Sequence, residues 1–343
     1  MTLTQNKDYS ISLVRLLATV FIVACHIMQY NDFVLAWWFN VGVQIFLCMS
    51  GFLYSKKEIT NPLGFYKKQL WKILVDYYIV VLTASLLQFI FLPQKITLFR
   101  FAKAFFLYGT LSGGEHLWYI PYIILCYILT PVLASLMKML YDKKSSLRLV
   151  LGSLLILLFS LVIFSSFFDY FNSAWVNCYI IGFILGFCQD KCKPLFGKLF
   201  IAISVVCVVM NFSQIYVEYF AKMQFSGAAA EIFRIFCDYA HVALGCFLFI
   251  ALHLAFSVIF KKKPPRIGGK ILDISDKLSY DVYLVHQFLI LGPMSLMAIT
   301  GLKWVNVIII IVLILVLSLG LNYLSKFIRD LCRRKARNEG TAK

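Results

Sequence analysis

The stretch "RLLATVFIVACH", residues 15–26, places a run of mostly apolar side chains between an arginine and a histidine. Ionisable side chains are costly inside lipid and usually serve a function there. Eleven helical steps of 100° end about 20° past three full turns, so Arg15 and His26 leave the same face of a helix, roughly 16 Å apart along its axis. Two interpretations remain open. One is a snorkelling arginine with a packed histidine, and the other is a functional stripe.

The rest of the chain has the composition of an integral membrane protein. Of its 343 residues 61% are hydrophobic and only 14% are charged, which is far too apolar for a soluble domain of this length. Runs of about 20 apolar residues, long enough to cross a bilayer, recur from end to end. We therefore expect an all-α bundle of about ten transmembrane helices in residues 1–330, followed by a basic cytoplasmic tail, 331–343. The expected spans are residues 9–30, 34–55, 73–92, 116–139, 148–167, 174–190, 196–216, 236–260, 279–300 and 304–328.

The net charge of +17 is explained by topology rather than by nucleic acid. The basic residues alternate from one connecting segment to the next. With the N-terminus in the cytoplasm, most of the 33 Lys and Arg residues fall on the inner side, as in segments 56–72 and 261–277. Both termini are then cytoplasmic. The basic residues left in outer segments are Lys95, Arg100, Lys103, Lys222, Arg234 and Lys303.

The ten cysteines do not predict a metal site. Most lie within apolar runs, where cysteine behaves as a small hydrophobic residue. Cys188 and Cys192 are one helical turn apart, but no second pair of Cys or His completes a zinc set. We expect no permanently bound cofactor.

Two motifs lie on the expected cytoplasmic side. Ser50 and Gly51 in "VQIFLCMSGFLYSKK" allow a close approach, either of a ligand or of a neighbouring helix. Lys68 and Lys72 stand four residues apart and share a helix face. They either anchor the helix at the inner surface or bind the phosphates of a nucleotide.

Two further motifs carry histidines. In "EHLWYIPYIILCYILTPVL", residues 115–133, Trp118 and Tyr119 fit an aromatic interface belt. Glu115 and His116 beside them fit either an outer polar pocket or an exposed pair in a loop. In "LSYDVYLVHQF", residues 278–288, Tyr283 lies one turn before His286. We interpret two other intramembrane histidines, His241 and His253, as structural.

Taken in this order, the motifs resemble acyltransferase family 3, whose members are multi-span membrane enzymes that modify extracytoplasmic glycans and other acceptors. The resemblance extends from Arg15 to about residue 288. It implies a transmembrane acyl relay. Lysines stand at the third span where the family often has arginines, so the fork that grips phosphate in two places is lost there. The tryptophan of the fourth span, Trp118, is followed by Tyr119 and not by an acidic residue.

The resemblance assigns roles to the candidate residues. His26 acts as the catalytic base or as an acyl-carrying nucleophile. Arg15, Lys68 and Lys72 bind an acyl-CoA co-substrate, most simply acetyl-CoA, from the cytoplasm. Further pocket candidates are Ser50, Gly51, His116, Trp118, Tyr119, Tyr283 and His286.

The expected activity is O-acetyl transfer to a hydroxyl of an exported or surface glycan, in the plasma membrane of a bacterium. Alternatives within the same fold are succinyl transfer or an acceptor that is a lipid or an amino acid. A transporter or a ligand-sensing module is a different class. The chain lacks the paired Gly- or Pro-broken segments typical of transport sites. The residues do not specify the acceptor or the oligomeric state.

The charge distribution predicts which segments are accessible from each side. Single cysteines placed in segment 261–277 of a cysteine-free variant should react with an impermeant maleimide only from the cytoplasm. Cysteines in segment 95–103 should react only from outside. Labelling of a Lys262→Cys variant from the outside would contradict this topology.

Overall fold

The computed structural model describes residues 7–142, 145–166, 170–260 and 266–341, with side chains described up to Arg334. The described residues are helical with short connections and no β-strand, which confirms the predicted all-helical class. They form two compact units, and helices α1 (Tyr9–Tyr30) and α2 (Ala36–Phe39) contribute to both. Lys261, Lys262 and Lys263, which the topology prediction used, lie outside the described residues.

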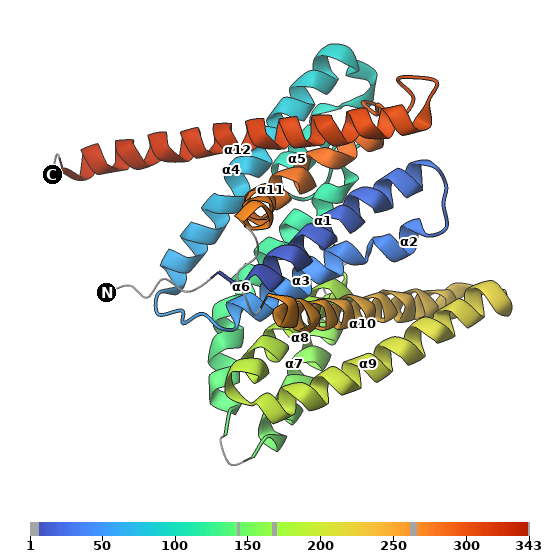
Figure 1. The fold of residues 1–343 in the computed structure, drawn as a ribbon, viewed down its shortest axis with the longest axis vertical. Coiled ribbons are helices and arrows are strands. Elements are labelled where there is room, and N and C mark those ends of the chain that lie inside the picture. Colours follow the sequence, from blue (N-terminus) through green and yellow to red (C-terminus); the bar gives the residue numbers. More distant parts are fainter. Residues whose placement is uncertain (1–6, 143–144, 167–169, 261–265, 342–343) are drawn as a thin grey trace. The chain divides into compact units, whose positions relative to one another are not determined.

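Unit 1 contains the first part of α1, the segment from Trp38 to Pro62 and the segment from Tyr122 to Pro265. Its helices, drawn from blue through yellow to orange in Figure 1, are α3 (Val41–Tyr54), α6 (Tyr119–Leu140), α7 (Leu147–Ser166), α8 (Ser173–Lys191), α9 (Lys193–Ile215), the π-helical turn η3 (Tyr216–Phe220) and α10 (Gly227–Ile259).

Glycines allow α3 and α8 to pack backbone against backbone in unit 1. A Cβ atom on Gly182 or Gly186 of α8 would overlap the backbone of Cys48 or Phe52 on α3. On α3, a Cβ atom on Gly51 would overlap the backbone of Tyr179. Such small-residue contacts are a principal way to hold helices together in lipid, where burial of apolar surface gives little driving force.

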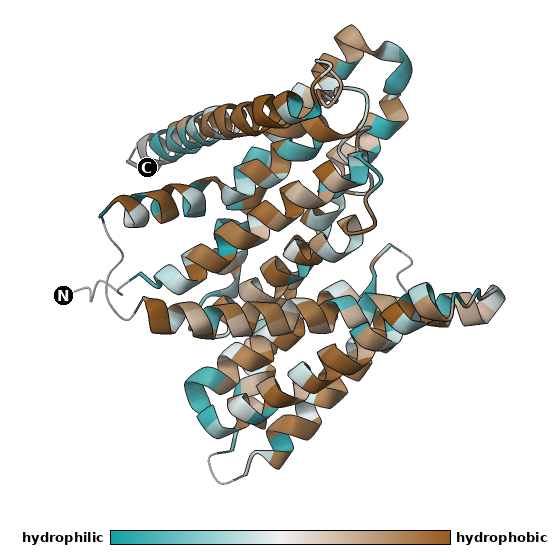
Figure 2. Ribbon diagram, turned by 45° about the vertical axis from the view of Figure 1, so that its right-hand side comes forward, coloured by the Kyte–Doolittle hydropathy of each residue, from teal (hydrophilic) through white to brown (hydrophobic). Residues whose placement is uncertain are grey.

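Unit 2 contains residues 22–37, 63–121 and 266–343. Its helices are α4 (Pro62–Phe91), the 3₁₀ turn η1 (Pro93–Lys95), α5 (Leu98–Phe105), the 3₁₀ turn η2 (Glu115–Trp118), α11 (Arg266–Ile290) and α12 (Lys303–Thr341). The expected tail from 331 is therefore a continuation of α12 as far as Thr341. Figure 2 shows hydrophobic residues along the first part of α12 and hydrophilic ones toward its C-terminal end.

Polar contacts attach α12 to α4 and α11 within unit 2. The Arg329 guanidinium forms an ion pair with Asp76, at 3.1 Å, and Asn322 donates to Asp281 at 2.8 Å. Both carboxylates are buried. Beside them, Leu278 and Val282 of α11 join Ile310 and Ile314 of α12 in an apolar cluster. Because a buried charge is costly without its partner, the ion pair fixes which face of α12 meets α4.

Eight segments of the described residues are long and apolar enough to cross a membrane, where we expected ten. Each expected span has a corresponding helix, but α8 and α11 are not among the eight. Helix α8 is almost wholly buried within unit 1, so it needs little lipid-facing apolar surface. Helix α11 carries charged residues, including Asp273, Asp276 and Lys277.

The boundaries expected for the span 279–300 are wrong. Helix α11 begins at Arg266 and ends at Ile290, and residues 291–302 form no helix. Gly292 adopts a positive φ of 79° and is followed by Pro293, which has no N–H to donate to a helix. The apolar run continues past this break, and for that reason hydrophobicity alone misplaced the end.

The glycine contacts predict a local defect that can be measured. A Gly182→Val substitution should destabilise the protein by about 1–3 kcal/mol, because the new side chain meets the backbone of α3. The measurement is the thermal unfolding midpoint of the purified protein in detergent. Gly197→Val in α9 is the matched control, since a Cβ atom added at Gly197 would meet nothing within 4 Å. Equal midpoints for the two variants would contradict the close contact.

Candidate active site

Three histidines from distant parts of the chain meet in unit 2. His26 lies on α1, His116 on η2 and His286 on α11. The ring centroids of His26 and His286 are 5.1 Å apart, and those of His116 and His286 are 4.9 Å apart. The structure therefore brings together three of the residues that the sequence singled out separately.

Backbone carbonyls determine which nitrogen of each buried ring carries the proton. His286 Nδ1 lies 2.7 Å from the Tyr283 carbonyl and 3.1 Å from that of Val282. His116 Nε2 lies 3.1 Å from the Leu284 carbonyl. A carbonyl oxygen only accepts, so these nitrogens are donors. In the neutral rings, His286 Nε2 and His116 Nδ1 then hold lone pairs, and neither has a hydrogen-bond partner among the described residues.

His26 is more accessible than its two neighbours. It is half-buried, whereas His116 and His286 are buried. Its Nδ1 lies 3.0 Å from Oε1 of Gln29, one turn later on α1. With Nδ1 donating to that amide oxygen, Nε2 is the nitrogen that holds the lone pair. The Glu115 carboxylate lies near enough to His26 to interact with it electrostatically.

Side chains from α11 hold η2 in place. The His116 amide donates to Oε1 of Gln287 at 2.8 Å, and the Tyr283 hydroxyl donates to the His116 carbonyl. Tyr119 packs edge-on against Tyr283, with ring centroids 5.2 Å apart. Trp118 is half-buried and packs edge-on against Tyr119. Tyr283, Tyr119 and Trp118 thus lie around the histidine cluster.

Sequence reasoning did not single out Gln29 or Gln287, and it placed Glu115 with His116 either in an outer polar pocket or in an exposed loop. Gln29 follows His26 by one helical turn, and Gln287 directly follows His286. The position of Gln29, one helical turn from an intramembrane histidine, could have indicated that its side chain contacts His26. Gln287 gave a weaker signal, because its amide group acts on the η2 backbone, 171 residues away in sequence.

The donor-side candidates are distributed over both units. Arg15 is half-buried in unit 1, and its guanidinium lies within electrostatic reach of the Tyr54 hydroxyl. Lys68 and Lys72 are exposed on α4 in unit 2. Their charged groups are accessible to a soluble anionic ligand.

Ser50 and Gly51 lie in the tightly packed contact between α3 and α8. Gly51 is buried against the backbone of Tyr179, and Ser50 beside it is half-buried. Contact between helices accounts for a glycine at position 51. A role for either residue in ligand binding stays a prediction.

The two histidines of unit 1 have partners that the sequence did not reveal. His253 Nδ1 lies 2.8 Å from the Ser10 hydroxyl, which donates to Asp8 at 2.6 Å. His241 lies edge-on to Trp38, with ring centroids 6.4 Å apart. Asp8 also accepts from the Ser10 amide at the start of α1. The His253 contacts therefore join this end of α1 to α10, which agrees with a structural role.

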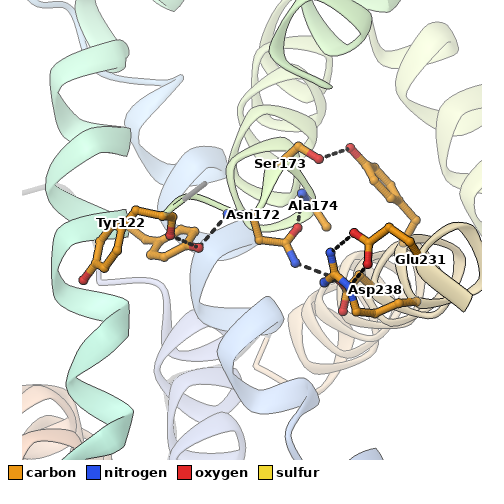
Figure 3. A network of polar contacts seen from close by, with 9 residues as sticks. Tyr122, Asn172, Ser173, Ala174, Glu231 and Asp238 are labelled. Atoms are coloured by element: carbon orange, nitrogen blue, oxygen red, sulfur yellow. Dashed lines mark hydrogen bonds and ion pairs between the residues drawn. The ribbon is translucent and has the colours of Figure 1, made fainter. Parts of the chain in front are cut away.

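A second polar network joins α6, α8 and α10 in unit 1 (Figure 3). Asn172 accepts from the Ala174 amide at the start of α8 and donates to Asp238 on α10 at 2.7 Å. The backbone N–H of Asn172 donates to the Tyr122 hydroxyl at 2.6 Å, and this hydrogen bond connects the network to α6. Arg234 bridges Glu231 and Asp238. The polar groups bond to one another, as expected of a network that fixes helix positions.

Within the described part of the chain, no group of three His, Cys, Asp or Glu side chains is arranged to hold a metal ion.

The sequence model of the acyltransferase domain matches residues 8–324, nearly the whole chain. The chain belongs to acyltransferase family 3. This confirms the resemblance inferred from the motifs. No match was found among curated proteins or among solved structures. An acyltransferase needs a group that takes a proton from its acceptor, and His26 Nε2 has the tautomer and the accessibility for that step.

Gln29 offers a test of how the His26 ring is held. A Gln29→Ala variant should reduce the kcat of acyl transfer roughly fivefold with little change in KM, because one hydrogen bond of about 1 kcal/mol orients the ring. Gln29→Glu keeps an oxygen acceptor and should retain activity. Gln224→Ala, another exposed glutamine, is the matched control. Full activity of Gln29→Ala would show that this contact does not orient the ring.

Proposed function

We propose that this chain is a membrane O-acyltransferase that moves an acyl group, most simply acetyl, from cytoplasmic acyl-CoA to a hydroxyl of an extracytoplasmic glycan. Membership in acyltransferase family 3 supports acyl transfer, and the apolar helices support a membrane location. The charge distribution supports cytoplasmic termini. The bacterial plasma membrane, the acetyl group and the glycan acceptor belong to this proposal.

The observation that carries the proposal is the accessible base beside two buried neutral histidines. His26 Nε2 holds its lone pair because the proton stays on Nδ1, which donates to Oε1 of Gln29. His116 and His286 are held by backbone carbonyls. Two neutral rings beside His26 place no fixed positive charge there, so His26 remains able to accept a proton.

The proposed reaction begins with the acceptor. His26 Nε2 takes the proton of the acceptor hydroxyl as the oxygen attacks the thioester carbonyl of acyl-CoA. The carbon–sulfur bond breaks, the acyl group stays on the acceptor oxygen, and the CoA thiolate leaves with the proton that His26 returns. The Glu115 charge stabilises the imidazolium between these steps. An acyl-histidine formed at His26 is the covalent form of the same transfer.

The proposed donor site uses the basic residues of the inner side. Arg15, Lys68 and Lys72 would hold the phosphates of CoA, which are multiply charged and suit charge-assisted hydrogen bonds. Arg15 and His26 share the continuous helix α1, and the roughly 16 Å between them along its axis is a length that the extended pantetheine arm covers. Acyl-CoA is a co-substrate in this scheme and not a resident cofactor.

A His26→Ala variant tests the function directly. It should insert and accumulate normally but transfer no detectable acyl group, since the base is lost. The measurement is the mass of the surface glycan from cells with the parent chain, with the variant and with no chain. A glycan mass that is larger by one acetyl or one succinyl group in cells with the parent chain identifies the acyl group that is transferred. His241→Ala, which removes a unit 1 histidine, is the control and should retain transfer per folded molecule. Glycan modification by His26→Ala would exclude His26 as the base.

A further inference from the structure

Helix α5 has the character of a helix that lies in a membrane surface. It is only eight residues long, so it cannot span a bilayer. Its side chains Leu98 and Phe99 are 83% and 69% exposed, and Phe106, directly after it, is 76% exposed. Apolar groups so exposed on a short connecting segment indicate insertion into the boundary between headgroups and hydrocarbon.

The same segment is strongly basic. Lys95, Arg100 and Lys103 fall within nine residues, and no acidic residue occurs between Asp76 and Glu115. In the proposed topology this segment faces outward, where membrane proteins normally avoid basic residues. Half of the basic residues assigned to outer segments are gathered here. The positive-inside rule therefore does not explain these three basic residues.

The cations are held beside the apolar side chains. Lys103 Nζ lies 4.5 Å from the ring centroid of Phe99 and 5.9 Å from that of Tyr108. Arg100 is exposed one turn from the start of α5, which the Thr97 side chain caps. A ligand meeting this face would contact hydrocarbon-compatible groups and positive charge together. That pairing matches a lipid with an anionic phosphate headgroup.

Helix α5 is firmly joined to the rest of unit 2. The Tyr77 hydroxyl of α4 donates to the Ala104 carbonyl at 2.6 Å, and Tyr78 packs against Phe105 with centroids 5.0 Å apart. The following loop is also held, because Gln88 donates to the Ser112 carbonyl at 2.8 Å. That loop leads directly into η2, which carries His116.

We propose that α5 is the docking surface for an acceptor linked through phosphate to a membrane lipid. Its exposed apolar side chains enter the lipid, and Arg100 and Lys103 bind the phosphate between the lipid and the glycan. The glycan hydroxyl is thereby kept near the histidine cluster. This inference rests on the proposed function and names the class of its acceptor.

The test uses the purified full chain in mixed micelles of detergent and phosphatidylcholine, with radiolabelled acetyl-CoA as donor. The acceptor is the organic-solvent extract of source membranes, or the water-soluble glycan of the same cells. Label should enter the solvent-extracted material and be released into water by mild acid, which cleaves sugar–phosphate bonds. An Arg100→Gln/Lys103→Gln variant should need roughly 25-fold more extract for its half-maximal rate, since each cation near a lipid phosphate contributes about fivefold.

Two variants separate this effect from a general loss of charge or fold. Lys222→Gln/Lys303→Gln removes two other outer lysines and should behave as the parent. Arg100→Lys/Lys103→Arg keeps the charges and should retain most of the affinity. Added phosphatidylglycerol should compete with the extract for the parent chain and much less for the Arg100→Gln/Lys103→Gln variant.

The results distinguish failure of the docking surface from failure of the proposed function. Label found only in the water-soluble glycan would overturn the lipid-linked acceptor while leaving acyl transfer intact. If Arg100→Gln/Lys103→Gln and Lys222→Gln/Lys303→Gln needed the same amount of extract for the half-maximal rate, α5 would be overturned as the docking surface. An absence of competition by phosphatidylglycerol would overturn it as well. No labelled product with either acceptor would refute the proposed function, and this inference with it.

Discussion

The backbone carbonyls of α11 from Val282 to Leu284 provide the constraint on which the candidate active site depends. Lipid offers no hydrogen-bond acceptor, so an imidazole N–H buried in a helix bundle needs one from the protein. These carbonyls accept from His286 and His116. They thereby determine the tautomer of each ring, and they leave an open lone pair on each ring beside His26. A shift of α11 would change the tautomers and the position of η2 together.

The position of α11 is in turn set by contacts of two kinds. Apolar side chains of α11 and α12 pack together, but apolar packing alone permits a helix to rotate or slide in lipid. The Asn322–Asp281 hydrogen bond and the Arg329–Asp76 ion pair prevent such rotation and sliding. Each would leave a buried carboxylate unpaired if α12 moved by a turn. Polar contacts remote from the histidines thus define the geometry of the candidate site.

Unit 1 is held together by different means. Glycines on α3 and α8 allow a backbone contact whose strength comes from close packing. The network around Asn172 and Asp238 joins the start of α8 to the interior of α10. No histidine cluster of the kind in unit 2 occurs in the part of unit 1 that the structure describes. These features suit a scaffold, with the candidate proton-transfer residues in unit 2 and Arg15 as the candidate ligand-binding charge of unit 1.

The sequence by itself determined the helical membrane class, the family and the three histidine motifs. Apolar runs of bilayer length, and ionisable residues inside them, are local features that can be recognised in the sequence alone. Tertiary structure alone decided that His26, His116 and His286 meet, and that Gln29 and Gln287 support them. Helical periodicity tells which face of a helix a residue occupies, but not which neighbour that face meets. The end of α11 was misplaced for a related reason, because hydrophobicity continues through Gly292 and Pro293 while helical hydrogen bonding does not.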